Sequence, residues 1–185
     1  MDIKSIKDYL KDGADARLSV DPEFVYTLGE EIAKRMLKGN KLILMGNGGS
    51  AADAQHIAAE FVCRFEKERR PMPALALHAN TSVLTAISND YGYDHVYSRQ
   101  IEAFAHEGDI VIGISTSGNS ENVIRAIDKA RELGCLTIVF TGKSGGKLAN
   151  KAQYILKVDS TRTSIIQEVH IAVGHMLSKI VEDRL

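Results

Sequence analysis

The sequence predicts an α/β fold in three layers, a doubly wound, five-stranded parallel sheet with helices on both faces. Short apolar runs of strand length alternate with stretches of helical periodicity along the chain. This alternation is typical of parallel strands that helical crossovers join and cover on both faces. Two of the apolar runs also end directly in turns rich in glycine or serine, as strands do before a helix at a ligand site.

The helices and strands follow one another in a regular order. A helix begins at Asp21 and Pro22, an N-cap and a first helical position, and runs to about Gly39. One face of this helix is apolar and carries Phe24, Leu28, Ile32 and Met36. The five strands are expected at residues 41–46, 74–77, 110–115, 136–140 and 154–158. Further helices are expected at residues 50–64, 82–88, 96–105, 120–133 and from 164 onward, with a turn at Asn89, Asp90 and Gly92.

Composition limits the classes of partner. The 185 residues include 23 basic and 24 acidic side chains, a formal net charge of -1, so we expect neither nucleic acid nor membrane as a partner. No internal repeat or low-complexity linker is present, which predicts one domain over residues 1–185. The helices within residues 1–38 are expected to pack at an oligomer interface, with packing on their own sheet as the alternative.

The sequence also predicts a cytoplasmic protein. The N-terminal residues mix charge through every turn and do not form a signal peptide, and no stretch is long and apolar enough for a membrane helix. Cys63 and Cys135 are far apart in apolar patterns, so no disulfide framework is implied. Both cysteines are expected to be buried packing residues in a reducing compartment.

The first turn, residues 46–50, indicates an anion site. Its glycines, at 46, 48 and 49, allow a sharp turn and a close approach to a ligand. Ser50 is expected at the N-cap of the next helix, where its hydroxyl and free backbone N–H groups can bind an anion. The segment lacks the lysine of a Walker motif and does not fit the GxGxxG pattern, which argues against a nucleotide. A tight turn without a ligand is the competing interpretation.

The second turn, residues 115–120, is rich in hydroxyl groups. They belong to Ser115, Thr116, Ser117 and Ser120, around one glycine, and their composition suits the oxygens of a phosphoryl group. If the sheet has the flavodoxin-like order 2-1-3-4-5, both turns lie at the topological switch point and face one ligand. A third turn, residues 141–148, has a similar composition, but we interpret it as a simple connection.

The helix after the first turn carries a candidate acid/base pair. His56 and Glu60 are four residues apart and share one face, with Asp53 near the same stripe. A histidine and a carboxylate one turn apart can bind a divalent metal or transfer a proton. An exposed surface pair is the alternative, which the neighbouring phosphate-type turn makes less favourable.

The closing helix adds further polar candidates beside a buried stripe. Gln167 and His175 are eight residues apart, about 12 Å along an ideal helix, so they would have to lean toward one ligand from opposite ends. His170 is expected at the surface or at an interface. The buried stripe is expected to consist of Ile166, Val169, Val173, Leu177 and Ile180.

Several segments in order resemble the sedoheptulose 7-phosphate isomerases of the SIS (sugar isomerase) family. They are GNGGSAADAQHIAAE, SNDYGY, GDIVIGISTSGNSENVIRA, TGKSGG and IQEVHI with a later histidine, from about Leu42 to His175. The resemblance implies an SIS domain that forms a homotetramer with active sites at subunit interfaces. It also implies conversion of sedoheptulose 7-phosphate to a glycero-manno-heptose 7-phosphate, which supplies heptose for lipopolysaccharide, capsule or another glycan.

The resemblance also assigns roles to residues. Glu60 and His175 match the proton-transfer pair of the family. A zinc site found in some members matches His56, Glu60, Gln167 and His175. The matched substrate-binding positions are Asn47, Gly48, Gly49, Ser50, Glu60, Asn89, Asp90, Ser115, Thr116, Ser117, Ser120 and Gln167. One departure lies before the IQE segment, where Ser164 and Ile165 replace the usual residues and Arg162 is displaced.

Three rival functions follow from the same resemblance. An isomerase of another sugar phosphate, such as arabinose 5-phosphate, typically carries regulatory repeats for which 185 residues leave no room. A non-catalytic relative that associates with the bacterial replication initiator lacks the histidine that matches His175. A sugar-phosphate sensor acting on transcription would need a DNA-binding segment, and none is visible.

Overall fold

The computed structural model describes residues 1–185 and contains one five-stranded, fully parallel sheet. Its strands are β1 (Leu42–Gly46), β2 (Ala74–Ala76), β3 (Ile110–Ser115), β4 (Leu136–Thr141) and β5 (Tyr154–Lys157). The strand order is β2-β1-β3-β4-β5, so the predicted flavodoxin-like order is confirmed. Gly46 of β1 pairs beside Ile114 of β3, and the turns that follow these strands therefore leave the sheet at the same edge.

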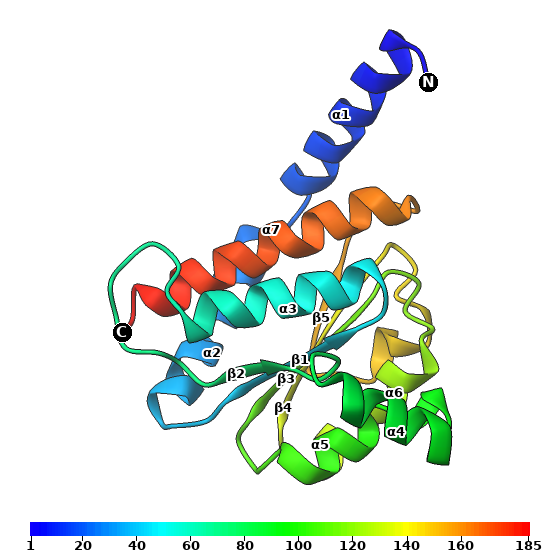
Figure 1. The fold of residues 1–185 in the computed structure, drawn as a ribbon. Coiled ribbons are helices and arrows are strands. Elements are labelled where there is room, and N and C mark those ends of the chain that lie inside the picture. Colours follow the sequence, from blue (N-terminus) through cyan, green and yellow to red (C-terminus); the bar gives the residue numbers. More distant parts are fainter.

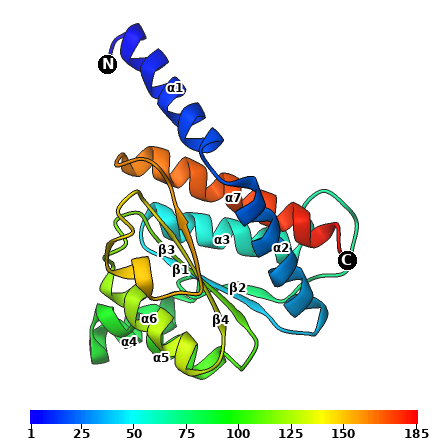
Figure 2. The ribbon, with the colours of Figure 1, turned by 180° about the vertical axis from the view of Figure 1, so that it is seen from behind.

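Helices cover both faces of the sheet, as predicted. The α-helices are α1 (Ile3–Leu18), α2 (Pro22–Leu37), α3 (Gly49–Val62), α4 (Thr81–Tyr91), α5 (Ser98–Phe104), α6 (Glu121–Glu132) and α7 (Thr163–Glu182). Two short 3₁₀ turns span Tyr93–His95 and Gly146–Asn150. Helices α2, α3 and α7 lie on one face of the sheet, and α4, α5 and α6 lie on the other (Figures 1 and 2). None of the helices combines the length and the apolar composition that a membrane crossing needs.

Alternate residues of the central strands feed two separate cores. Leu42 and Leu44 of β1 point into the core under α2, α3 and α7. Ile43 and Met45 point into the core under α5 and α6. This period of two directs the side chains of the central strands into two apolar layers, which explains why β1, β3 and β4 are buried along their whole length.

Helices α3 and α7 run side by side across one face of the sheet (Figure 1). Gly174 of α7 allows close packing, because a Cβ there would overlap the side chain of Ile57 on α3. Ile166, Val169, Val173 and Leu177 of α7 are buried, which confirms most of the predicted stripe, while Ile180 is partly buried. The two helices that carry the candidate acid/base residues are therefore held against each other.

The two N-terminal helices differ in how they pack. Asp21 caps α2 by accepting a hydrogen bond from the Glu23 backbone N–H, with Pro22 at the first helical position, as predicted. Leu28 and Ile32 of α2 are fully buried in the chain's own core. Helix α1 instead projects beyond the rest of the molecule (Figures 1 and 2). An oligomer interface over residues 1–38 stays a prediction.

Two local predictions are wrong. Asn89 and Asp90 were expected in a turn, but α4 continues through both and ends at Tyr91. Gly92 is its C-cap, with a φ of 88° that glycine readily adopts. Cys63 was expected to be buried, but it is exposed at the C-cap of α3, immediately after the last residue of that helix. Cys135 is buried as expected, and both thiols are free.

Candidate active site

The first turn joins β1 to α3 and exposes the start of that helix. Gly48 adopts φ 55° and ψ -120°, a conformation that favours glycine, so the chain turns sharply after β1. Because of this turn, α3 begins at Gly49, and the expectation of Ser50 at the N-cap is wrong by two positions. Ser50 is buried, whereas Gly48 and Gly49 are exposed. The exposed backbone at this helix N-terminus is suited to an anion.

A polar network holds the side chain of Asn47 in the first turn. Asn47 and Asn122 exchange two amide hydrogen bonds of 2.9 and 3.0 Å. The Tyr93 hydroxyl donates to Asn47 Oδ1 at 3.0 Å, and the buried Tyr97 donates to the carbonyl oxygen of Gly46. Burial raises the pKa of Tyr97, so its hydroxyl remains a donor.

These network residues escaped prediction from the sequence. Tyr93 closes the SNDYGY segment, which was a usable signal for it. Asn122 lies within the GDIVIGISTSGNSENVIRA segment, but its role, like that of Tyr97, depends on how α6 and α5 lie against the first turn.

The second turn follows β3 and gathers hydroxyl groups, as predicted. The hydroxyl oxygens of Ser115 and Ser120 lie 2.9 Å apart. Thr116 and Ser117 line a pocket beside the turn. The same pocket is also lined by four more residues that carry hydroxyl groups, Ser144, Ser160, Thr161 and Thr163. The pocket therefore offers several neutral donors to a phosphoryl group.

The third turn supports the second one. The backbone N–H of Leu148 donates to the carbonyl oxygen of Gly118 at 3.0 Å, and that of Lys147 donates to Asn119 Oδ1 at 3.0 Å. Gly118 has a φ of 67°, and a Cβ there would overlap the carbonyl oxygen of Gly145. The connection from β4 to β5 thus shapes the hydroxyl-rich turn as well as joining the two strands.

His56, Glu60 and His175 meet in a compact cluster within one chain. His56 Nε2 lies 3.1 Å from Glu60 Oε1 and 3.1 Å from His175 Nε2. One ligand atom from each of the three residues lies within 4.8 Å of the others. The ring of Phe65 stacks on His175 with 5.7 Å between ring centroids. The predicted carboxylate and imidazole pair is therefore brought together by α3 and α7 without a second subunit.

Gln167 and Asp53 lie on the same two helices, closer to their N-terminal ends. A Cβ at Gly49 would lie 2.5 Å from Gln167 Nε2, so Gln167 covers the start of α3 at the first turn. Oδ2 of Asp53 is buried without a hydrogen-bond partner. Burial raises the pKa of Asp53 to about 6, although the charge of His56 opposes this shift. Gln167 therefore lies beside the first turn, toward the N-terminal ends of both helices.

Asn89 and Asp90 are not joined to the two turns by any hydrogen bond. Both side chains are exposed near the end of α4, where Asn89 Nδ2 donates to Asp90 Oδ1 at 2.9 Å. Asp90 also lines a groove between α4 and α5. Their predicted role in substrate binding stays a prediction.

His170 was expected at the surface or an interface, and this expectation is wrong. Its side chain is fully buried, and Nε2 donates to the carbonyl oxygen of Thr141 at 3.1 Å. Nδ1 has no partner. Burial lowers the pKa of His170 to about 4, although the hydrogen bond to Thr141 opposes this shift. The close packing of α7 on β4 makes this position internal.

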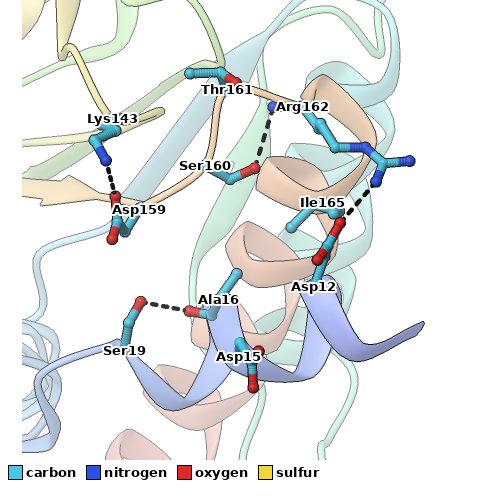
Figure 3. Close-up of a pocket in the computed structure, with 10 residues that line it drawn as sticks. All are labelled: Asp12, Asp15, Ala16, Ser19, Lys143, Asp159, Ser160, Thr161, Arg162 and Ile165. Carbon is cyan, nitrogen blue, oxygen red and sulfur yellow. Dashed lines mark hydrogen bonds and ion pairs between the residues drawn. The ribbon is translucent and has the colours of Figure 1, made fainter. Parts of the chain in front are cut away.

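The displaced arginine before α7 faces α1. Arg162 Nη1 pairs with Asp12 Oδ2 at 2.9 Å, and its guanidinium lies 4.7 Å from the ring centre of Tyr9. Figure 3 shows this pair at one end of a pocket, with the exposed ion pair of Lys143 and Asp159 at the other end. Within one chain Arg162 therefore ties the N-terminal helix to the start of α7.

The cluster of His56, Glu60 and His175 fits a zinc ion. Two imidazole nitrogens and one carboxylate oxygen are ligand types that Zn²⁺ prefers, and three protein ligands leave a position for a substrate oxygen. Gln167 is the fourth residue of the predicted set, but its side chain lies against Gly49 at the other end of α3. Three of the four predicted zinc ligands therefore lie together in the structure, and Gln167 does not lie with them.

Comparison with known proteins identifies the family. The family model described as SIS domain matches residues 20–142, which is more than half of the chain. The chain belongs to the SIS domain family. This SIS domain contains both turns that border the candidate site, whereas His175 lies beyond the matched residues.

Relatives of this SIS domain match it over nearly its full length. A protein of Thermoplasma acidophilum, described as a probable phosphoheptose isomerase, is 54% identical over 96% of this chain and 98% of its own. The phosphoheptose isomerase of Aquifex aeolicus is 50% identical over 98% of this chain and 96% of its own. The structure of the phosphoheptose isomerase of Neisseria gonorrhoeae matches with a TM-score of 0.91 and 38% identity, covering 97% of this chain and 98% of that one.

Proposed function

We propose that this SIS domain is a phosphoheptose isomerase that interconverts sedoheptulose 7-phosphate and a glycero-manno-heptose 7-phosphate. Full-length relatives with this name support the assignment. The observation that carries it is the meeting of Glu60 and His175 in one cluster, with Glu60 on α3, the helix that starts at the first turn, and His175 on α7. The phosphate end of the sugar binds at the two turns, and the carbonyl end reaches the cluster.

The reaction moves one hydrogen between neighbouring carbon atoms. The Glu60 carboxylate removes a proton from C1 of the ketose, and the electron pair of the C–H bond forms the C1–C2 double bond of an enediolate. His175 protonates the oxygen at C2 and takes the proton from the oxygen at C1. Glu60 then returns its proton to C2, which leaves an aldehyde at C1 and a hydroxyl at C2. Atoms and electrons balance without an external oxidant.

A zinc ion bound by His56, Glu60 and His175, with Gln167 as the fourth predicted ligand, is part of the proposal. Such an ion supplies a positive charge that polarises the oxygens at C1 and C2. The stacking of Phe65 on His175 holds the orientation of the imidazole ring. His56 orients Glu60 through the 3.1 Å contact between them.

The decisive experiment compares wild type with Glu60→Gln and His175→Gln in a coupled assay on sedoheptulose 7-phosphate. We expect each variant to lose about 100- to 10,000-fold in kcat, because general acid/base catalysis contributes that much. Binding of the sugar phosphate, measured by calorimetry, should be retained because the two turns are unchanged. Wild type that binds but does not isomerise would identify a binding protein, and active variants would reject the catalytic pair.

The finer parts of the proposal concern assembly and pathway. We propose a homotetramer, in line with the exposed apolar residues of α1, and a cytoplasmic location, in line with two free thiols. The product would supply heptose for a glycan. An isomerase of another sugar phosphate is the alternative, and the same assay with arabinose 5-phosphate distinguishes the two.

A further inference from the structure

A buried ion pair joins the far ends of the two site helices. Glu182 is the last residue of α7, and Arg69 lies in the segment that leaves α3. Their side chains are 0% and 8% exposed, and Arg69 Nε lies 3.4 Å from Glu182 Oε1. We call these two residues the clamp. In Figure 1 the segment after α3 arcs past the C-terminal end of α7, where the clamp lies.

Glu182 is held by the segment after α3. Its carboxylate accepts backbone N–H groups from Phe65 at 3.0 Å, Glu66 at 2.8 Å and Lys67 at 2.9 Å. Burial alone would raise the pKa of Glu182, but the three N–H groups and the charge of Arg69 lower it. A carboxylate at a helix C-terminus interacts unfavourably with the helix dipole, and these contacts offset that interaction for Glu182. Glu182 therefore fixes the path of residues 65–67.

Arg69 caps the end of α3. Its Nη2 donates to the carbonyl oxygen of Glu60 at 2.6 Å, and its Nη1 donates to that of Phe61 at 2.7 Å and of Cys63 at 3.3 Å. The last carbonyl groups of a helix have no partner within the helix, and here one guanidinium serves three of them. The backbone of Glu60 is thus bonded directly to the clamp.

Phe65 connects the clamp to the other half of the cluster. Its backbone N–H is bound by Glu182, and its ring stacks on His175 at an interplanar angle of 27°. One ion pair therefore supports Glu60 through a backbone hydrogen bond and His175 through an aromatic contact. Neither residue of the clamp belongs to the phosphate-type turns.

We propose that Arg69 and Glu182 are positioning residues that fix Glu60 and His175 relative to each other for proton transfer. The inference rests on the proposed isomerase function. Misplacing a catalytic group by about 1 Å can cost about 100-fold in rate. Because the clamp lies at the opposite end of α3 from the first turn, its loss affects the chemical step and leaves sugar phosphate binding intact.

The test is Glu182→Gln in the full-length assembled protein, with Asp183→Asn as the matched control. An amide offers one acceptor oxygen in place of two, so a backbone N–H of residues 65–67 loses its partner. The control makes the same change one residue away, at a side chain that is 39% exposed and that contacts this segment only through the Lys67 ammonium group, not through a backbone N–H. We expect kcat of Glu182→Gln to fall about 10- to 100-fold, with KM within about twofold of wild type. Hydrogen exchange of residues 65–67 should accelerate, and the control should match wild type.

Several outcomes would overturn the inference. One is faster exchange of residues 65–67 with an unchanged kcat, and another is an equal loss of kcat in the control. If Glu182→Gln fails to fold, Arg69→Lys and Phe65→Leu are measured in the same assays in its place. Lysine keeps the charge but not the fork of donors, and leucine keeps the backbone N–H but not the ring. Unchanged kcat in both would also overturn the inference, whereas inactive wild type would instead reject the proposed function.

Discussion

His170 remains neutral in the folded chain because it is buried between α7 and β4. The pKa is lowered to about 4 by burial, while an unfolded chain has a histidine near 6.5. Between these values the unfolded state binds more protons than the folded state, so stability rises with pH across this window. His170 thus opposes folding in mild acid.

We expect His170→Gln to be less sensitive to acid than wild type. Glutamine can still donate to the carbonyl oxygen of Thr141, but it does not titrate. The loss in free energy of unfolding between pH 6.5 and pH 4 should therefore be smaller in the variant. Urea unfolding of both proteins at several pH values measures this difference, and parallel losses would contradict the explanation.

Zinc binding is predicted from the donor atoms of His56, Glu60 and His175. We expect His56→Gln to lower zinc affinity by at least about 10-fold, because one of the clustered donors is lost. Competition with a chelating dye measures the affinity. His106→Gln is the control, since its side chain is exposed and outside the cluster. Equal affinity in both variants would reject the site.

At the level of single residues, the sequence predicted the pairing of His56 with Glu60, but local patterns did not place the histidines of α7. The spacing of His56 and Glu60 follows from helical geometry alone. The proximity of His175 to both residues followed only from family resemblance, because no local pattern reports how α3 and α7 pack. His170 was misplaced for the same reason, since a lone histidine gives no sign of which helix face it occupies.

At the level of elements, the second turn depends on a glycine contact with the third. We expect Gly118→Ala to lower the free energy of unfolding by about 1–3 kcal/mol, because alanine is strained at a φ of 67° and its Cβ would overlap Gly145. Sugar phosphate binding should weaken as the hydroxyl groups shift. Thermal unfolding and calorimetry measure the two effects. Gly39→Ala is the control, because it has a positive φ with open space around it, so a similar loss of binding would contradict the role of the contact.

The sequence predicted most elements because alternation of apolar and polar residues is a local property. The strand order was the flavodoxin-like order assumed for such an alternation, and the structure confirms it. The end of α4 was missed because Asn89 and Asp90 are typical turn residues, and the helix continues to the glycine at position 92. Local sequence patterns did not predict how the helices and strands pack against one another.

At the level of the whole molecule, α1 carries an apolar stripe with no partner in the chain. Ile3, Ile6 and Leu10 are 74%, 46% and 65% exposed. Their spacing places them on one face of the helix, which projects from the body (Figure 1). Exposed apolar stripes of this kind typically mark an interface.

We expect Ile6→Glu combined with Leu10→Glu to break the proposed tetramer. Light scattering should give a mass of four 20.2 kDa chains for wild type and a smaller assembly for the variant. Lys4→Glu, a charge change away from the stripe on the same helix, should leave the assembly intact. The monomer should remain folded, because neither side chain is part of the core. An unchanged mass in the double variant would show that α1 is not the interface.

Helix α3 begins at the first turn and carries Glu60 ten residues beyond Ser50, about 15 Å along its axis. A helix keeps its length, so under the proposed function we expect this span to set the number of carbons between the phosphate and the carbonyl of the sugar. A shorter ketose phosphate seated in the same turn would present its carbonyl before it reached the carboxylate. Such a ketose phosphate would bind as a competitive inhibitor of the heptulose phosphate and would dissociate without being isomerised.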